Sequence, residues 1–323
     1  MEKNIVLVFL FLSTLLLNNS FSEESVGCPH AVGKGKIKIR TKIAYIEAEK
    51  CYSDEIWKSF RVNSVYTKDY DKMVDLPSGW HLKKTKSILG IEYGISDRLS
   101  MGLATSYITK NLKRQIWSKK GGKTVWQNVD DTGIEGLWFS AKYLLYSNPN
   151  GLFGFDYKDG LFIAFGYKPS ISSDKKIKNG IGSGSDDFKF VILSHPHFTE
   201  NFFLCSDIWC HYRGEVKEIE NFSKSGIDLG DRFGYRFIFG YEFPNHKIVL
   251  AGGPQGWISG KNKKDGNIED SNTHSHGFLI KVRWQPFGDE DAGSIDCGIR
   301  LPIKEKLPFS SNYMIALSGR IKF

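Results

Sequence analysis

The stretch FGYRFIFGYEF, residues 233–243, restricts the fold more than any other part of the chain, because every second residue is aromatic. Its odd-numbered positions are all Phe or Tyr, and its even-numbered positions are glycine, isoleucine, arginine or glutamate. Successive side chains of a β-strand point to opposite faces, so the pattern predicts a strand with one aromatic face and one small or charged face. A soluble sandwich with the aromatic face inward and a membrane barrel with that face toward lipid both accommodate such a strand.

The lengths of the connections between strands distinguish these two folds. Alternation predicts strands at about 36–48, 80–95, 98–109, 133–146, 160–168, 186–194, 202–213, 233–243, 247–258, 275–285, 293–301 and 312–323. Alternate connections are short (96–97, 147–159, 195–201, 244–246 and 286–292), and those between are mostly longer and polar (49–79, 110–132, 169–185, 214–232, 259–274 and 302–311). Short periplasmic turns and longer extracellular loops are typical of an up-and-down membrane barrel. The sequence therefore predicts an all-β fold, a transmembrane antiparallel β-barrel of about 12 strands.

The faces of other predicted strands support a barrel with a wet interior. In 275–285 the even positions are mostly apolar, whereas Lys281 and Arg283 lie on the opposite face. The first and last predicted strands divide in the same way. Charges at this density cannot be buried in a sandwich core without partners, so the charged face must meet water. If the sheet closes, that face encloses a polar lumen.

The N-terminus has the organisation of a secretory signal peptide. Lys3 precedes an apolar run at 5–17, which is followed by small residues that include Ser20 and Ser22. The run is too short, and its following residues are too polar, for a comfortable spanning helix. We predict a signal peptide at 1–22, an N-terminal linker at 23–35 and an outer-membrane barrel at 36–323, with export of the mature chain to the cell outer membrane.

The chain has a formal net charge of +8, which can indicate nucleic acid, an anionic surface or a path for an anionic solute. Export makes nucleic acid the least expected of these three. We therefore expect outer-membrane lipid and a small-molecule solute as partners, and no nucleic acid.

Strand parity predicts which charged side chains line the lumen. The expected pore-lining residues are Lys38, Arg40, Lys42, Glu92, Lys142, Arg236, Glu242, Lys281, Arg283, Arg300 and Arg320. Asp187, Asp207 and Asp296 oppose them, but basic residues remain in excess, and rings of Lys and Arg favour anions. Cross-strand salt bridges in a closed barrel would use the same residues.

A barrel with these charged lumen residues is compatible with three functions. A passive channel for small solutes is the leading hypothesis, and a structural or surface-interaction barrel without an open pore is the second. A barrel-embedded hydrolase is the third; it would need a Ser, a His and a carboxylate or amide together on one wall. No short motif indicates such a group, so we predict no enzyme activity and no cofactor.

Histidines and cysteines near 195–211 suggest a metal site only superficially. His195 and His197 flank a proline in a predicted turn and nothing fixes a third ligand, so solvated turn histidines are favoured and no metal is predicted. Cys205 and Cys210 are five positions apart in one predicted strand, an odd spacing, so they face opposite sides and cannot pair without breaking the strand. A Cys28–Cys51 bridge is left open by the sequence.

Two signatures resemble known families. The chain ends in Phe323 with apolar residues at alternating positions before it, including Tyr313 and Ile321, which is similar to the C-terminal assembly signal of Gram-negative outer-membrane barrels. That resemblance implies recognition of the last strand by the barrel-assembly machinery.

The second signature covers roughly residues 80–323. The segments EYGISDRLSMGLATSY (92–107), DDTGIEGLWFSAKYLLY (130–146) and SGSDDFKF (183–190) resemble the outer-membrane channels grouped as the transporter family of the meta-pathway of phenol degradation. Glu135 precedes Gly136 where that family's pattern has Asp after the glycine, and the lysine-rich loops depart from it. Membership would imply a β-barrel for small hydrophobic or aromatic compounds.

Overall fold

The computed structural model describes residues 32–48, 50–52, 73–75, 78–118, 123–148, 159–179, 181–199, 201–219, 226–243, 247–264, 267–268, 273–286, 293–306, 309–310 and 314–323. The predicted signal peptide and Tyr313 lie outside the described residues, and so does the linker except for residues 32–35. Cys28 also lies outside them, so its pairing with Cys51 stays a prediction. Within the described part of the chain, Cys205, Cys210 and Cys297 form no disulfide bond.

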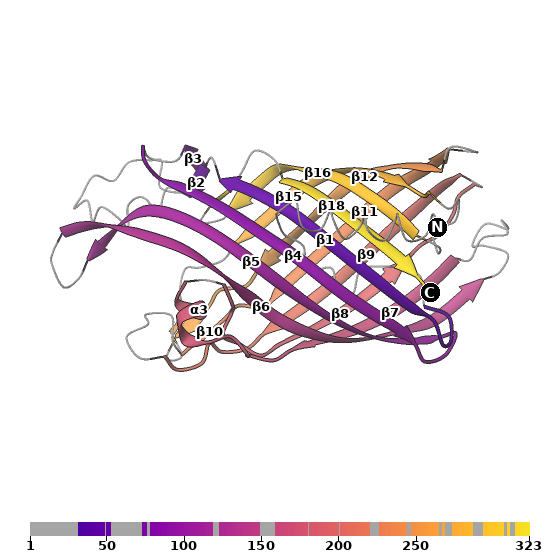
Figure 1. The fold of residues 1–323 in the computed structure, drawn as a ribbon, viewed down its shortest axis with the longest axis horizontal. Helices are drawn as coiled ribbons and strands as arrows, with labels where there is room; N and C mark the ends of the chain where they lie inside the picture. Colours follow the sequence, from indigo (N-terminus) through magenta and orange to yellow (C-terminus); the bar gives the residue numbers. More distant parts are fainter. Residues whose placement is uncertain are drawn as a thin grey trace, which may run out of the picture.

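Twelve antiparallel strands close into a barrel in the order β1-β18-β16-β15-β12-β11-β9-β8-β7-β6-β5-β4 (Figure 1). Their bounds are Ile37–Ala48 (β1), His81–Gly94 (β4), Leu99–Ser118 (β5), Lys123–Asn148 (β6), Asp159–Lys168 (β7), Asp187–Ser194 (β8), Phe202–Arg213 (β9), Arg232–Phe243 (β11), Ile248–Ser259 (β12), His274–Trp284 (β15), Gly293–Lys306 (β16) and Met314–Lys322 (β18). Each predicted strand matches one of these, so the predicted 12-stranded up-and-down barrel is confirmed.

Six short strands form two small sheets separate from the barrel. One has the order β17-β2-β3, with bounds Phe309–Ser310, Lys50–Tyr52 and Met73–Asp75. The other has the order β10-β13-β14, with bounds Ile227–Asp228, Lys263–Lys264 and Asn267–Ile268. All six lie in the connections that the sequence predicts to be longer and polar, so these connections carry some regular structure of their own.

The seam that closes the barrel joins β1 to β18, the first and last strands. They pair antiparallel from Lys38 opposite Lys322 to Tyr45 opposite Ile315. The backbone N–H of Phe323 donates to the carbonyl oxygen of Ile37 at 2.8 Å, and the N–H of Ile37 donates to the carbonyl oxygen of Phe323 at 3.1 Å. The last residue thus extends the seam, at the end of the barrel where β4 turns into β5 (Figure 1).

The connection at 110–132, which the sequence predicts to be a polar loop, is instead an extended hairpin. β5 continues to Ser118 and β6 begins at Lys123, and the two strands pair along this whole length. β6 has 26 residues, whereas a transmembrane strand needs about 9–11. The loop prediction is wrong because backbone pairing in water does not require an apolar face, so a strand beyond the membrane loses the alternation that identifies it.

The outer surface of the barrel is apolar. On β11 the aromatic side chains Phe233, Phe239, Tyr241 and Phe243 are 40–46% exposed, whereas Gly234, Ile238 and Gly240 between them are buried. Phe165 of β7 and Phe188 of β8 are each 56% exposed. Soluble monomers rarely expose contiguous apolar surface of this extent, whereas a barrel in lipid requires it.

No helix among the described residues has the length and apolar composition of a membrane span.

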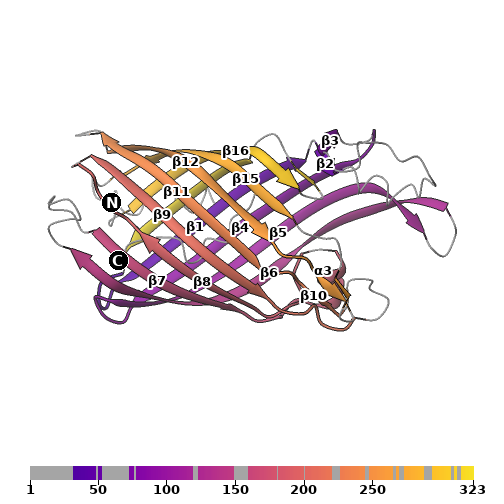
Figure 2. The same cartoon turned by 180° about the vertical axis from the view of Figure 1, so that it is seen from behind.

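Glycines on the inner face of β11 make room for aromatic rings of β9, on the side of the barrel seen in Figure 2. A Cβ at Gly240 would lie 2.2 Å from the ring of Phe203, and one at Gly234 would lie 2.2 Å from the ring of Trp209. The small positions of the aromatic repeat therefore let the inner wall carry rings as well, because a side chain there would collide with them.

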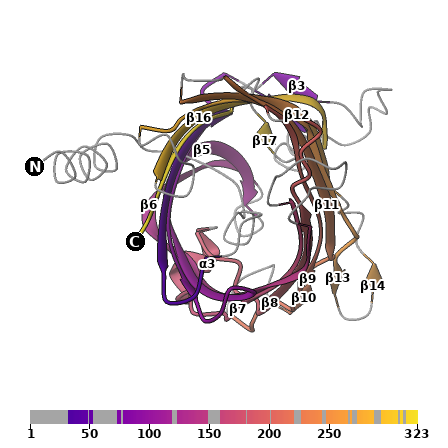
Figure 3. The same cartoon turned by 90° about the vertical axis from the view of Figure 1, so that its right-hand side faces the viewer.

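The connection between β7 and β8 folds against the inner wall. It contains the short helix α3, Asp174–Lys178, which lies inside the ring of strands in the view along the barrel axis (Figure 3). Ile177 of α3 is buried with residues of the connection after β9. The Lys176 ammonium forms an ion pair with Asp131, and the Lys110 ammonium donates to the carbonyl oxygen of Asn179 at 2.8 Å. These contacts attach the segment to β5 and β6.

Candidate functional site: a cavity inside the barrel

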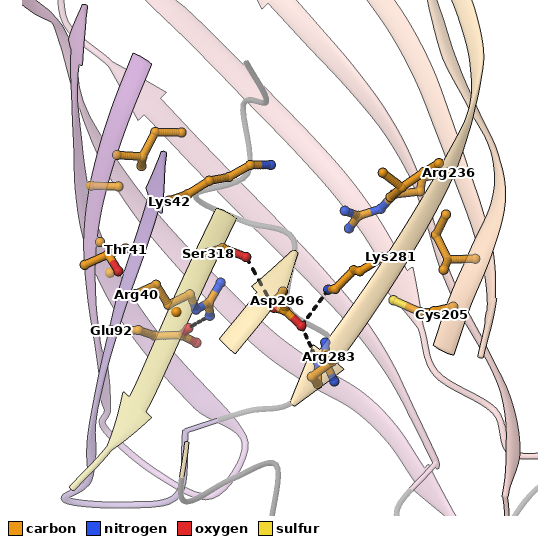
Figure 4. Close-up of a pocket in the computed structure, with 18 of the residues that line it drawn as sticks. Arg40, Thr41, Lys42, Glu92, Cys205, Arg236, Lys281, Arg283, Asp296 and Ser318 are labelled. Carbon is orange, nitrogen blue, oxygen red and sulfur yellow. Dashed lines mark hydrogen bonds and ion pairs between the residues drawn. The ribbon is translucent and has the colours of Figure 1, made fainter. Parts of the chain in front are cut away.

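A cavity inside the barrel is lined by described residues of every barrel strand except β7 and β8. It has a volume of about 1210 Å³, including space that is open to solvent. Figure 4 shows its charged side chains, which project inward from opposite walls. The charged lining residues are Arg40, Lys42, Arg236, Lys281 and Arg283 together with Glu92 and Asp296. Five cations thus face two carboxylates, an excess of three positive charges among the described lining residues.

Glu92 of β4 is the centre of one polar cluster. Arg40 of β1 forms an ion pair with this carboxylate, and the Lys142 ammonium of β6 lies 2.7 Å from its Oε1. The Ser100 hydroxyl of β5 donates to the same oxygen at 2.5 Å. Parity places all four residues on the inner face, so a single partly buried carboxylate joins four neighbouring strands of the barrel wall.

Asp296 of β16 is the centre of a second cluster. Its Oδ1 lies 2.6 Å from Nε of Arg283 and 3.3 Å from Nζ of Lys281, both on β15, and Ser318 of β18 donates to Oδ2 at 3.3 Å. One carboxylate therefore faces two cations. Both clusters are thus more basic than acidic, and the positive potential they leave is strengthened by the low dielectric of the barrel wall.

Arg236 forms a third ion pair at the opposite wall. Its guanidinium on β11 contacts Oδ2 of Asp207 on β9 through Nε at 2.6 Å and through the terminal nitrogen at 2.5 Å. The two residues are direct register partners across the strands. This arginine is thus held in one orientation by a carboxylate behind it, while its other edge faces the cavity (Figure 4).

Between these charges the wall is apolar. Phe203 of β9, Ile238 of β11, and Val249 and Ala251 of β12 line the cavity and are each less than 9% exposed. The thiol of Cys205 lies beside them. β9, β11 and β12 are neighbours in the barrel, so these side chains form one continuous surface, which we call the apolar wall.

The remaining predicted lumen residues lie elsewhere. Lys38 is buried on the inner face of β1, in register with Glu92, and does not line the cavity. Arg300 donates to Glu305 at 2.8 Å near the other end of β16. Glu242 is half-buried opposite Val249. The backbone of Arg320 pairs with that of Arg40, and its side chain lies outside the described part of the structure.

Two further buried ion clusters were not predicted from the sequence. Lys86 forms an ion pair with Glu135, which also accepts a hydrogen bond from Ser106 at 2.8 Å. Lys86 and Glu92 have the same parity in one strand, so the sequence alone indicates that Lys86 faces inward. Glu135 lies at a β-bulge, where the alternation of side chains between the two faces is interrupted.

The second of these clusters joins β7, β8 and β9. The Lys168 ammonium forms an ion pair with Asp187, and Nε2 of His211 lies 3.3 Å from the same carboxylate. The Ser185 hydroxyl donates to Asp187 at 2.7 Å. A hydrolytic triad needs the serine bonded to the histidine, whereas here both bind one carboxylate, so this cluster does not activate the serine.

The prediction of solvated turn histidines is wrong for His195. This residue is 5% exposed, and its ring packs against those of His197 and Phe203 at centroid distances of 4.8 and 4.9 Å. The inner-face parity of β8 continues through this position and carries the ring into the barrel. Within the described ranges, no three His, Cys, Asp or Glu side chains gather as metal ligands.

Solved structures give the similarity of this fold to known proteins. No family model and no curated protein matches the chain. The COG4313 outer membrane channel from Pseudomonas putida F1 is similar with a TM-score of 0.67 at 12% identity, over 94% of this chain and 100% of that one. The Ralstonia pickettii toluene transporter TbuX has a TM-score of 0.46 at 9% identity over 93% of each chain. The first similarity shows that this chain has the fold of an outer-membrane β-barrel.

Proposed function

We propose that this protein is an outer-membrane channel for the passive passage of small solutes. The observation that carries the proposal is a cavity inside a closed barrel whose outer surface is apolar and whose inner wall carries charge. An apolar exterior places the barrel in lipid, and an interior of charged side chains needs water. The similar fold of a protein described as an outer membrane channel supports this function.

The solutes we propose are small hydrophobic, aromatic or anionic compounds. The cation excess lowers the barrier for anions, and the apolar wall offers contact to hydrocarbon. Further partners are outer-membrane lipid and, through the last strand, the barrel-assembly machinery, with no part for nucleic acid, a metal or a cofactor. Export by residues 1–22 would deliver the chain to the outer membrane.

Reconstitution in planar lipid bilayers tests the channel directly. We expect discrete current steps from refolded protein whose folded state is verified by a heat-dependent shift on semi-native gels. Folded protein that gives no current at any voltage would contradict the channel and favour a surface-interaction barrel without an open pore.

The α3 segment is the observation that favours this second function, because it occupies the inner side of one end of the barrel. If it narrows an open pore, then breaking its attachment should widen that pore. We expect Lys176→Met to raise single-channel conductance or to add open-state noise, because it removes the ion pair with Asp131. Lys175→Met is the matched control, since Lys175 is exposed on the same helix. Equal conductance of both variants and the wild type would show that α3 does not limit the current.

The last residue gives a prediction about assembly. Deleting Phe323 should strongly lower the amount of barrel in the outer membrane, because it removes the terminal apolar residue and the last pair of seam hydrogen bonds. Phe323→Ala retains the backbone bonds and so separates the two causes. Its side chain is 59% exposed, so loss of internal packing would explain little of a defect. Outer-membrane levels measured by immunoblot that stay unchanged in the deletion would refute the assembly signal.

A further inference from the structure

The wall of the cavity is divided by chemistry around its circumference. β9, β11 and β12 contribute the apolar wall of Phe203, Ile238, Val249 and Ala251. The strands from β15 through β16, β18 and β1 to β4 carry six of the seven described charged lining residues, including Glu92 and Asp296. Arg236 of β11 lies on the same side as the apolar wall, so a solute in the cavity meets hydrocarbon and one cation on this side and several fixed charges on the other.

Two cations approach the cavity from opposite sides. Figure 4 shows the Lys42 side chain from β1 and the Arg236 side chain from β11 pointing toward each other across the space. Asp207 balances Arg236 and Lys142 adds to the charge near Glu92, so counting these two neighbours leaves the excess at three positive charges. A negative group between the two walls would be stabilised from both sides.

An aromatic ring forms part of the apolar wall. Phe203 is 7% exposed and is held over Gly240, where any Cβ would overlap its ring. This ring also packs against that of His195 at a centroid distance of 4.9 Å, and its remaining surface is one on which a second ring can stack or meet edge to face. The cavity is partly open to solvent, so a small solute can reach this ring.

We propose that this cavity selects amphipathic organic anions, compounds with one short hydrocarbon or aromatic body and one carboxylate. The body lies against the apolar wall, and the carboxylate lies among Lys42, Arg236 and Lys281. A neutral hydrocarbon gains nothing from the cation excess, and a small hydrated anion gains nothing from the apolar wall. Only a solute with both parts uses both sides of the cavity. The proposal rests on the channel function above and assigns its substrate class.

Block of the single-channel current tests this assignment with three probes. Phenylacetate carries a ring and a carboxylate, 2-phenylethanol carries the ring alone, and acetate carries the carboxylate alone. We expect phenylacetate to reduce the mean current at a concentration about tenfold lower than acetate, the factor expected when half of a ring's surface leaves water. It should also act at a lower concentration than 2-phenylethanol, which has the same ring but no charge for the cations to attract. Chloride serves as the background anion throughout.

Two variants separate the two halves of the site. Lys42→Met should weaken block by phenylacetate and acetate and leave block by 2-phenylethanol unchanged, and Lys304→Met is its control, because Lys304 is exposed outside the cavity and carries the same charge. Val249→Thr replaces one lining methyl by a hydroxyl at nearly constant volume and should weaken block by both ring compounds severalfold. Val191→Thr makes the same change on β8, at a buried position that does not line the cavity.

The outcomes distinguish this assignment from the channel function itself. Folded protein without any current overturns the channel, and the assignment with it. A conducting protein that phenylacetate blocks no better than acetate and 2-phenylethanol keeps the channel and overturns the assignment. Equal weakening by Lys42→Met and Lys304→Met would likewise overturn it, since general surface charge would then explain the block.

Discussion

The triple variant Arg236→Gln, Lys281→Gln, Arg283→Gln should lose anion preference in a salt gradient, with its reversal potential shifted toward that of a cation-preferring pore. The wild-type cavity has five cationic lining residues against two carboxylates, and the variant would have two against two. Low-dielectric walls magnify such a change in fixed charge. The difference between wild type and variant should shrink at high salt, because the Debye length falls from about 10 Å at 0.1 M to about 3 Å at 1 M.

Removing both partners of an ion pair in the wall provides a control, because it changes side chains without changing the net charge. The double variant Arg236→Gln, Asp207→Asn removes a whole pair and leaves the net charge unchanged, so we expect near wild-type reversal potential. Asp296→Asn removes a carboxylate next to Lys281 and Arg283 and should increase anion preference. A wild-type pore that already prefers cations, or a triple variant with unchanged reversal potential, would place the selectivity outside this cavity.

The strands and their faces were predictable from the sequence, because the alternation of side chains is a property of the extended backbone alone. On β11 and β15 the apolar outward positions are continuous enough to fix the inward ones, and Arg236, Lys281 and Arg283 all point into the barrel. The pairing of these charges was not predictable. Parity gives the face of a side chain, whereas its height relative to the next strand depends on the register of the closed barrel. Arg236 meets Asp207 and Arg283 meets Asp296 because they are register partners.

Irregular backbone explains the residues that sequence reasoning missed. β5 and β6 shift register between Ser106 and Tyr107, so Glu135 turns inward beside Gly136 and meets Lys86, although its neighbours follow the usual alternation. A β-bulge changes the parity of everything beyond it, and the sequence carries no reliable mark of its position. The docking of α3 on the inner wall depends on contacts such as Lys176 with Asp131, which are 45 residues apart. Such contacts follow from the closed fold and cannot be read from local pattern.

The apolar wall was also not anticipated, although its residues share inner faces with the predicted charges. Ile238, Val249 and Ala251 occupy inward positions, but the other inward residues of β11 are glycine, arginine or glutamate, and those of β12 include glycine, glutamine and serine. Their side chains become one surface only when β9, β11 and β12 are brought side by side with matching heights. The division of the cavity into an apolar and a charged side is therefore a property of the tertiary structure, and it is the property that the proposed selectivity depends on.

The buried carboxylate of Asp187 gives the largest expected effect on stability. It is 1% exposed and accepts from the Lys168 ammonium and the Ser185 hydroxyl, with His211 at 3.3 Å. Asp187→Asn would leave the Lys168 charge in the wall without its carboxylate. Removing one partner of a buried ion pair costs about 3–5 kcal/mol. We expect the temperature at which the variant loses its folded mobility on semi-native gels to fall well below that of the wild type.

A second variant separates the cost of an uncompensated charge from the value of the pair itself. The double substitution Lys168→Met, Asp187→Leu removes both charges and fills the space with hydrocarbon, so no charge remains buried without a partner. Such replacements are often neutral or stabilising. We expect the double variant to unfold at a higher temperature than Asp187→Asn, although it changes one residue more. An equal fall in unfolding temperature in both variants would show that the attraction within the ion pair itself stabilises the fold. An unfolding temperature of Asp187→Asn equal to that of the wild type would show that water reaches Lys168 through the open end of the barrel.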